Sequence, residues 1–176
     1  QVRASGSAQV TASGSAQVRA SRYVAVTRHS GYRTPTVTGG VLIDIPRPRA
    51  LDEWFELYGV EVTDGMVTLY KAVDDDWATE RSRPVGIFYT PGSSPAAPDW
   101  DGGKEECGGG LHFTAHPHQA LDFNPVAQRY VACPIAVADI AFHPDAQHPT
   151  KVKASRVAGP IVEVTIDGQP VKAVPA

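Results

Sequence analysis

The hydrophobic positions at the start of the chain recur at a strict eight-residue interval. The pattern Gln-Val-x-Ala-Ser-Gly-Ser-Ala occurs twice and then decays, and its valines stand at Val2, Val10, Val18 and Val26. An eight-residue period fits neither an α-helix nor a heptad coiled coil. It predicts a strand of about four residues followed by a tight Ser-Gly-Ser turn, with valine and alanine on one face and polar side chains on the other.

A strand unit this short cannot bury its thin apolar face alone. We therefore expect the repeats to stack, with their valines in one shared column, as the end and cap of a β-solenoid over residues 1–40. Stacking can also occur between chains, so self-association through the β-solenoid is the partner interaction that this region predicts. The alternative is a disordered Ser/Gly/Ala linker. Because Gln1 already stands inside a repeat, the natural N-terminus is not visible.

Residues 41–176 carry the pattern of a compact α+β domain. A helix is predicted over residues 50–58, where apolar side chains follow helical spacing at Leu51, Trp54, Phe55 and Tyr58. Asp-Gly pairs between apolar runs predict two β-hairpins, at residues 60–73 and 161–174. Further strands are expected over residues 41–45, 85–89, 111–113, 129–138 and 151–157, with a short helix over 116–123. The predicted fold class is mainly β: a bent antiparallel sheet with one or two helices, preceded by the octapeptide-repeat stub.

The charge pattern narrows the classes of partner. The formal net charge is -3 with no clustered basic surface, so we expect no nucleic-acid partner. Lys151, Lys153 and Arg156 share one expected strand, and we interpret them as a solvated face. No apolar run approaches the ~18 residues of a membrane span, so no membrane partner is expected. Two cysteines, Cys107 and Cys133, do not make a disulfide scaffold. That favours the cytoplasm, although one bridge between them stays open.

The stretch CGGGLHFTAHPHQA, residues 107–120, is the strongest candidate for chemistry. Three consecutive glycines lose much entropy on folding, so they indicate a backbone that passes close to a ligand or to another strand. The histidines lack the spacing of zinc motifs, and we predict no metal site. A Cys107–His112 nucleophile pair and a cation site at residues 74–76 are further alternatives. The long loop over residues 90–104, which carries Trp100, is expected to be functional or to cover another part of the domain.

From Asp64 to Val171 the chain resembles an uncharacterised actinobacterial and actinophage domain of unknown function. The matching stretches are TLYKAVDDD (68–76), YTPGSSPAAPDWDGG (89–103), ECGGGLHFTAHPHQAL (106–121), RYVACPIAVADIAFHPDA (129–146) and KVKASRV (151–157). Similar octapeptide repeats often precede that domain. The resemblance implies a place in the cytoplasm or in a phage particle, leaves a protein partner open, and carries no established activity.

The segment Gly110–Thr114, followed by Ala120, is more weakly similar to the central strand-to-helix element of ADP-ribosyltransferase-like folds. That resemblance implies an effector with NAD as cofactor, in which a carboxylate stabilises the oxocarbenium-like centre as nicotinamide leaves. Carried onto this sequence, it implies catalytic roles for Lys71, His112 and Glu163. The ligand would also contact Tyr70, Gly109, Gly110, Thr114 and, from the long loop, Trp100. No arginine stands in the first-strand position, where those folds have one.

Two functions follow from these observations. The C-terminal domain is an ADP-ribosyltransferase-like, NAD-using enzyme, or it is a non-catalytic structural or binding module that terminates a repetitive β-solenoid stalk in a phage or bacterial assembly. The enzyme hypothesis requires Lys71, His112 and Glu163 to converge on one cavity. The module hypothesis predicts no such cleft and an exposed apolar or aromatic surface at the tip of the domain.

Overall fold

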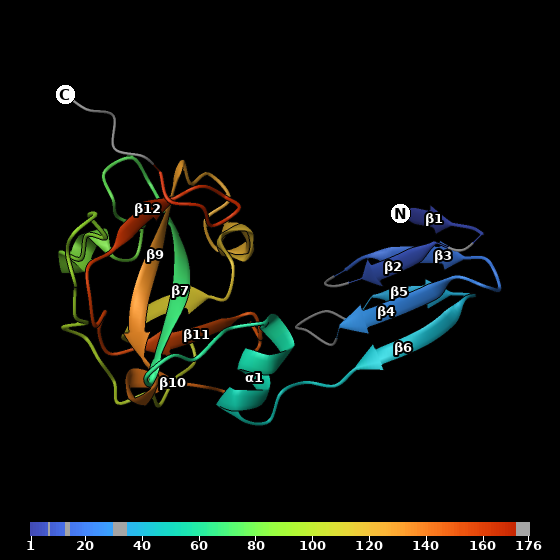
Figure 1. Ribbon diagram of the computed structural model, residues 1–176, viewed down its shortest axis with the longest axis horizontal. Helices are drawn as coiled ribbons and strands as arrows, with labels where there is room; N and C mark the ends of the chain where they lie inside the picture. The colour runs from blue at the N-terminus through green and yellow to red at the C-terminus, as the bar shows by residue number, and fades with distance from the viewer. Residues whose placement is uncertain (7, 13–14, 30–34, 172–176) are drawn as a thin grey trace. The chain divides into compact units, whose positions relative to one another are not determined.

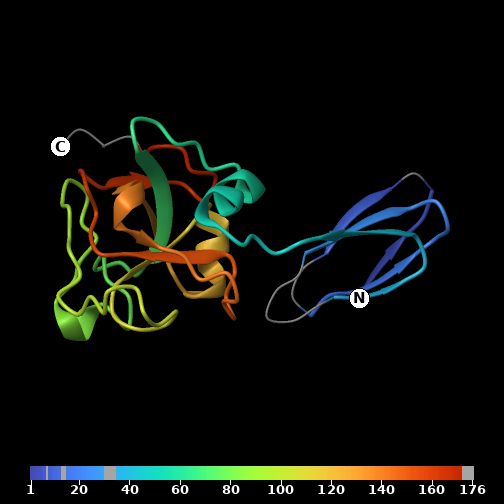
Figure 2. The same ribbon diagram turned by 90° about the horizontal axis from the view of Figure 1, so that it is seen from below.

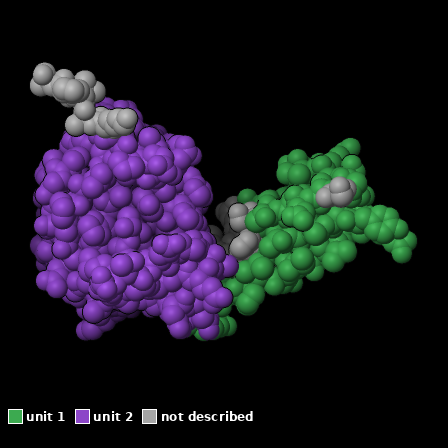
Figure 3. All heavy atoms as spheres, viewed as in Figure 1, with its two compact units in different colours: residues 1–49, 144–149 green, residues 50–143, 150–176 purple. Residues whose placement is uncertain are grey.

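The computed structural model describes residues 1–6, 8–12, 15–29 and 35–171. The chain divides into two compact units (Figure 3), one formed by residues 1–49 with 144–149 and the other by residues 50–143 with 150–176. Across the described ranges, every helix is too short or too polar to cross a membrane.

The strands of the first unit alternate between two sheets (Figure 2). One sheet has the order β1-β3-β5 and the other the order β2-β4-β6, and pairing is parallel in both. The strand Val41–Ile45, which we expected to begin the C-terminal domain, is β6 and pairs with β4. The six strands are β1 (Val2–Ala4), β2 (Gln9–Ala12), β3 (Gln17–Ala20), β4 (Ala25–His29), β5 (Thr36–Thr38) and β6 (Val41–Ile45).

The eight-residue period explains this alternation. Val18 and Val26 are buried in the apolar cluster of the unit, while the polar residues beside them point outward, as predicted. Val2 pairs with Val18, and Val10 pairs with Val26. Each strand therefore pairs with the strand two repeats away. The valines form one column in each sheet, and the single shared column that we expected is not what is seen.

The second unit is built on a six-stranded antiparallel sheet in the order β10-β11-β8-β7-β9-β12. Strand β11 runs across the direction of β7 and β9, so the sheet is bent (Figure 1). A mainly β domain with an antiparallel sheet was the prediction, and it is confirmed. The strands are β7 (Met66–Val73), β8 (Leu111–Thr114), β9 (Arg129–Ala136), β10 (Ile140–Ala141), β11 (Lys151–Ala154) and β12 (Val162–Val164).

The helices of this unit are short. The predicted helix is α1 (Leu51–Tyr58), which buries Trp54 and Phe55 and ends at Gly59, a left-handed residue with φ 64°. The second predicted helix is the 3₁₀ helix η2 (Pro117–Asp122), and η1 (Arg83–Val85) and η3 (Val137–Asp139) are also 3₁₀ helices. The strand expected over residues 85–89 is wrong. Gly86, at φ 72°, ends η1 there, and Tyr89 bonds to the carbonyl of Trp77 in a loop.

The two predicted hairpins keep their turns but not their full strands. Asp64 and Gly65 have positive φ, and the pairing before them is a single bridge between Thr63 and Met66. In the C-terminal turn, Val164 bridges Pro170, and part of the second predicted strand lies outside the described residues. Pro134 within the strand predicted over 129–138 indicates an edge strand, yet it lies in β9 between β7 and β12. It is tolerated because β12 pairs only with residues 130–132, so no ladder partner meets it on that side.

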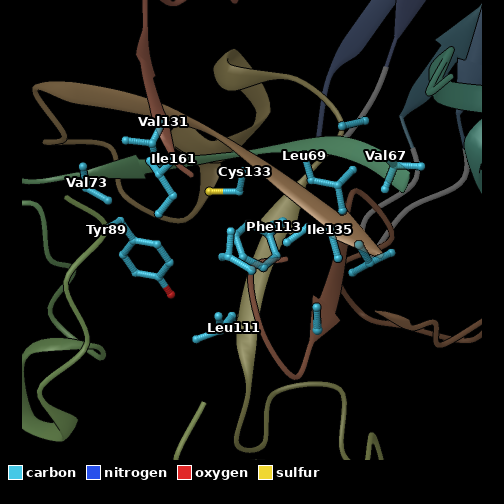
Figure 4. Close-up of a cluster of buried hydrophobic side chains, with 14 of the residues drawn as sticks. Val67, Leu69, Val73, Tyr89, Leu111, Phe113, Val131, Cys133, Ile135 and Ile161 are labelled. Atoms are coloured by element: carbon cyan, nitrogen blue, oxygen red, sulfur yellow. The ribbon is translucent and has the colours of Figure 1, made fainter. Parts of the chain in front are cut away.

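One continuous apolar core holds the second unit together (Figure 4). It lies on one face of the bent sheet and takes alternate residues from each central strand. These include Val67, Leu69 and Val73 of β7, Leu111 and Phe113 of β8, and Val131, Cys133 and Ile135 of β9. Burial of such side chains stabilises a fold by about 2 kcal/mol each. The core therefore fixes the strands from which the candidate site is built.

Candidate functional site

A cavity of about 510 Å³ lies where strands β7 and β8 separate. The two strands share one residue pair, Tyr70 with Thr114. Continued along both strands, this register would place Ala72 opposite His112, yet no such pair is formed. On its other edge β8 is paired with β11 along its whole length. The cavity thus opens on the unpaired edge of β8 and is lined mainly by residues 70–72, 79–81, 112–114, 123–126 and Lys151.

Lys71 lies in this gap. It shares the core-facing side of β7 with Leu69 and Val73, so its side chain starts among apolar neighbours. Its Nζ donates a hydrogen bond to the backbone carbonyl of His112 (2.9 Å) and lies 4.8 Å from the centre of the Tyr89 ring. The amine therefore satisfies a carbonyl that the missing ladder leaves open. Burial, together with the charges of nearby Lys151 and Arg81, lowers the pKa of Lys71 to about 8.

His112 faces the cavity as a neutral ring. Its Nε2 lies 3.2 Å from the backbone carbonyl of Glu106. A carbonyl can only accept, so Nε2 carries the proton and Nδ1 is the acceptor of the ring. Burial and the neighbouring charges of Lys71 and Lys151 lower the pKa of His112 to about 3. The side chain therefore adds hydrogen-bonding capacity to the cavity without adding charge.

Two further cations line the cavity. Lys151 is largely buried, with its Nζ 3.0 Å from the Sγ of Cys107, 4.0 Å from the Glu106 carboxylate and 5.5 Å from the centre of the Phe123 ring. Arg81 donates to the backbone carbonyl of Cys107 (3.1 Å). Together with Lys71 they bring three positive side chains to one cavity.

The acidic residues nearby offset only part of this charge, chiefly through the ion pair of Glu106 with Lys151. Asp74 lines the cavity, but its carboxylate is held by Arg83 (2.8 Å) and by the amide of Asn124 (2.9 Å). Asp76 also pairs with Arg83, at 2.9 Å. Asp75 lies 3.4 Å from the guanidinium of Arg129. The alternative of a cation site at residues 74–76 is therefore disfavoured, because each of its three carboxylates already has a cationic partner. Glu80, the other acidic lining residue, is exposed to solvent.

Four of the eight predicted site residues meet in this cavity: Tyr70, Lys71, His112 and Thr114. Thr114 is buried, and its hydroxyl donates to the carbonyl of His116 (2.9 Å), so its polar group is already committed to the fold. Tyr70 comes from the opposite side of β7 to Lys71 and lines the wall at the point where the strands still pair.

Glu163 lies elsewhere. It stands on β12, and β7 and β9 separate that strand from β8. Its carboxylate forms an ion pair with Arg129 at 2.9 Å, and Arg129 in turn stacks on Trp77, with 4.6 Å between guanidinium and ring centre. Glu163 is not among the residues that line the cavity. The structure therefore brings Lys71 and His112 together without the predicted carboxylate.

Gly109, Gly110 and Trp100 also lie outside the cavity, in a cradle around Lys153. This lysine is 1% exposed. Its Nζ donates to the Asp101 carboxylate (2.6 Å) and to the carbonyls of Glu105 and Gly109, and it lies 5.3 Å from the centre of the Trp100 ring. The bond from Lys153 holds the pKa of Asp101 at about 2. The long loop that we expected to be functional or to cover something covers this buried lysine.

The same cradle explains the run of glycines. A Cβ on Gly109 would stand 1.6 Å from the backbone oxygen of Asp99, and one on Gly108 would stand 2.1 Å from the Asp101 carboxylate. Gly110 has φ 126° and lies under the Trp100 ring, which a Cβ would approach to 2.9 Å. Of the two causes that we considered for these glycines, close approach of another part of the chain accounts for the observed contacts.

Our interpretation of the β11 charges needs correction. Lys153 is buried and the side chain of Lys151 is 8% exposed, so two of the three residues that we assigned to a solvated face are covered. Arg156 does remain exposed. The alternation of KVKASRV indicated a half-exposed strand, but it carries no signal for the loop that covers its outer face. Arg81 and Phe123 were likewise missed, because nothing local marks them as part of a cavity.

Comparison with known proteins identifies one matching family. A family model described as "Domain of unknown function (DUF7666)" matches residues 67–169. This span holds every residue that lines the cavity and the whole Lys153 cradle. The comparisons with curated proteins and with solved structures gave no match.

Proposed function

The chain belongs to the family described as Domain of unknown function (DUF7666), and from this premise we propose that its C-terminal domain binds a small anionic molecule in the cavity between β7 and β8. The observation that carries the proposal is the convergence of Lys71, Arg81 and Lys151 on one cavity. Structural cations normally sit beside a carboxylate, as Lys153 does with Asp101 and Lys151 with Glu106. Among the described residues, Lys71 and Arg81 form no ion pair with a carboxylate, so the cavity keeps an excess of positive charge that favours an anion from outside.

The rest of the lining fits a ligand with both a charged and an apolar part. Arg81 and Lys151 can donate to a phosphate or carboxylate, and charge-assisted hydrogen bonds of this kind are the strong ones. Phe123 and Val126 offer an apolar wall on the same cavity, and the neutral Nδ1 of His112 offers an acceptor. The volume of about 510 Å³ lies in the range of small-molecule sites.

An ADP-ribosyltransferase-like, NAD-using activity receives less support. Tyr70, Lys71, His112 and Thr114 do share the cavity. That chemistry, however, needs a carboxylate beside the centre where positive charge develops. Glu163 is held by Arg129 on another strand. NAD therefore enters our proposal as one candidate anion among others, and binding is favoured over catalysis.

Calorimetric titration of the chain with NAD, ADP and inorganic phosphate tests the proposal. We expect at least one of these to bind and to raise the melting temperature. Lys151→Gln and Arg81→Gln should each weaken that binding about tenfold or more, since each removes a charge-assisted bond. Lys104→Gln is the matched control, because Lys104 is an exposed lysine that does not line the cavity. Absence of binding by all three anions, or equal binding by all variants, would contradict the proposal.

A second role is favoured by the repeat unit. Strands that alternate between two parallel sheets, each paired with the strand two repeats away, are the arrangement expected of β-solenoid coils. We propose that residues 1–49 are part of such a stalk and that β6, an edge strand with exposed apolar side chains at Val41, Leu42 and Ile43, pairs with a second copy of this chain. The domain would then be the module that ends a stalk in a phage or bacterial assembly.

Light scattering over a range of concentrations tests the self-association. The wild-type chain should form concentration-dependent assemblies. Ile43→Lys on the edge strand β6 should reduce them, because an edge lysine opposes strand addition. Val62→Lys changes an exposed valine of the second unit and should leave them intact. A monodisperse monomer at every concentration would contradict a role in self-association.

A further inference from the structure

Lys71 differs from the other two cavity cations in its partners. Lys151 lies beside Glu106 and the thiol of Cys107, and Arg81 is bound to the carbonyl of Cys107. No carboxylate forms an ion pair with Lys71 among the described residues. Its Nζ has one hydrogen-bond acceptor, the carbonyl of His112, and otherwise faces aromatic rings and the cavity. An ammonium group has three donors, so this site leaves capacity unused.

The surroundings of Lys71 favour its neutral amine. It stands on the apolar face of β7, and two positive side chains share its cavity. Both effects penalise the ammonium form, in line with the lowered pKa. Near pH 8 about half of such an amine is neutral, against well under about 1% of an ordinary lysine. Lysines desolvated in an apolar pocket or placed next to another cation are the ones that act as nucleophiles towards carbonyl groups.

We propose that Lys71 forms a Schiff base with an anionic aldehyde or ketone that enters the cavity between β7 and β8. This inference rests on the proposed function, because the anionic group of the same molecule would be held by Lys151 and Arg81. It adds the chemical class of the ligand, a carbonyl compound that carries a phosphate or carboxylate, and it assigns a covalent site.

The condensation is balanced without an oxidant or a reductant. The lone pair of the neutral Nζ forms a bond to the carbonyl carbon as the carbon–oxygen π bond breaks, and one of the two Nζ protons passes to the oxygen to give a carbinolamine. The nitrogen then gives up its one remaining proton as the C=N double bond forms, and this proton leaves with the carbinolamine hydroxyl as water. The products are an imine between Nζ and the former carbonyl carbon and one molecule of water.

Three related probes distinguish anion binding in the cavity from Schiff-base formation at Lys71. Pyridoxal 5′-phosphate carries a phosphate and an aldehyde, pyridoxine 5′-phosphate carries the phosphate alone, and pyridoxal carries the aldehyde alone. The full chain is mixed with each probe near pH 8 and reduced with borohydride, and the modified lysines are identified by peptide mass mapping. Binding of pyridoxine 5′-phosphate is measured separately by calorimetry.

We expect pyridoxal 5′-phosphate to label Lys71 about tenfold or more in excess of Lys104, in keeping with its larger share of neutral amine. Pyridoxal should label it less, because it lacks the anionic group. Lys71→Arg and Lys71→Met should abolish the adduct. The two variants guard against misfolding, because the first keeps the charge and the second suits the apolar face. Lys104→Arg is the control and should leave labelling of Lys71 unchanged.

Each of the other outcomes contradicts the Schiff-base site, the role of phosphate as anchor, or both. Equal labelling of Lys71 and Lys104 overturns the Schiff-base site. Binding of pyridoxine 5′-phosphate without an adduct on Lys71 overturns that site while the anion-binding function stands. If an adduct forms on Lys71 although pyridoxine 5′-phosphate does not bind, Lys71 is a reactive lysine, but phosphate is not the group that anchors the ligand. Neither binding nor reaction overturns both.

Discussion

Two lysines of the same domain, Lys153 buried and Lys71 half-buried, have opposite surroundings. Lys153 lies in a closed cradle in which a carboxylate, two carbonyls and an aromatic ring receive its ammonium group. Lys71 lies in a gap between strands with one carbonyl acceptor and an open cavity. Burial alone therefore does not mark a functional charge. A functional charge is better marked by partial burial beside free space, with fewer hydrogen-bond partners than the group can use.

Replacement of Lys153 should have the largest effect on the stability of the domain. Lys153→Met removes a donor from two carbonyls and from the Asp101 carboxylate, which keeps the backbone N–H groups of Gly103 and Glu105. An acceptor left without its donor costs about 1–3 kcal/mol, so we expect a loss of about 3–4 kcal/mol for the three bonds together. Urea unfolding would measure the change. Lys104→Met should be near neutral, and a loss for Lys153→Met as small as that of the control would show that the cradle is not structural.

The second-largest loss of stability is expected at the glycines that line the Lys153 cradle. Gly109→Ala should destabilise the domain by about 2–3 kcal/mol, because its Cβ would overlap the backbone oxygen of Asp99. Gly102→Ala is the control, since a Cβ there meets open space and only the left-handed φ of 73° is strained, at about 1 kcal/mol. Equal melting temperatures for the two variants would mean that Asp99 moves aside freely and that the close approach is not the reason for glycine.

Lys71 should change the way in which the free energy of unfolding depends on pH. The pKa of Lys71 is about 8 in the folded chain, against an ordinary value of 10.5. Between these values the unfolded chain still holds a proton that the folded chain has released, so stability rises with pH. The stability of wild type minus that of Lys71→Met should therefore increase by roughly 2–3 kcal/mol from pH 8 to pH 10.5. Burial raises the pKa of the Cys133 thiol and of the Tyr89 hydroxyl, which has the opposite effect on stability, and the subtraction reduces their contribution. A difference that does not change with pH would contradict an unpaired, desolvated amine.

The sequence predicted the elements of the domain better than their contacts. Helix α1 followed from the spacing of Trp54 and Phe55, and the valine period predicted the first strands. The glycine run was recognised as a place of close approach, and Lys71 and His112 were assigned to one site. Each of these signals is local. The separation of β7 from β8 and the loop that covers Lys153 depend on contacts between distant segments, and the position of Glu163 depends on strand order.

The measurement that tests the central claim most directly is an NMR titration of the lysine side-chain signals, with and without pyridoxine 5′-phosphate. We predict that Lys71 titrates with a pKa of about 8 in the free chain and that the phosphate raises this value, because an anion favours the ammonium form. The signal of Lys153 should not respond to the phosphate, since its cradle is closed. A Lys71 pKa near 10.5 that is indifferent to the phosphate would contradict the account of an open cationic cavity.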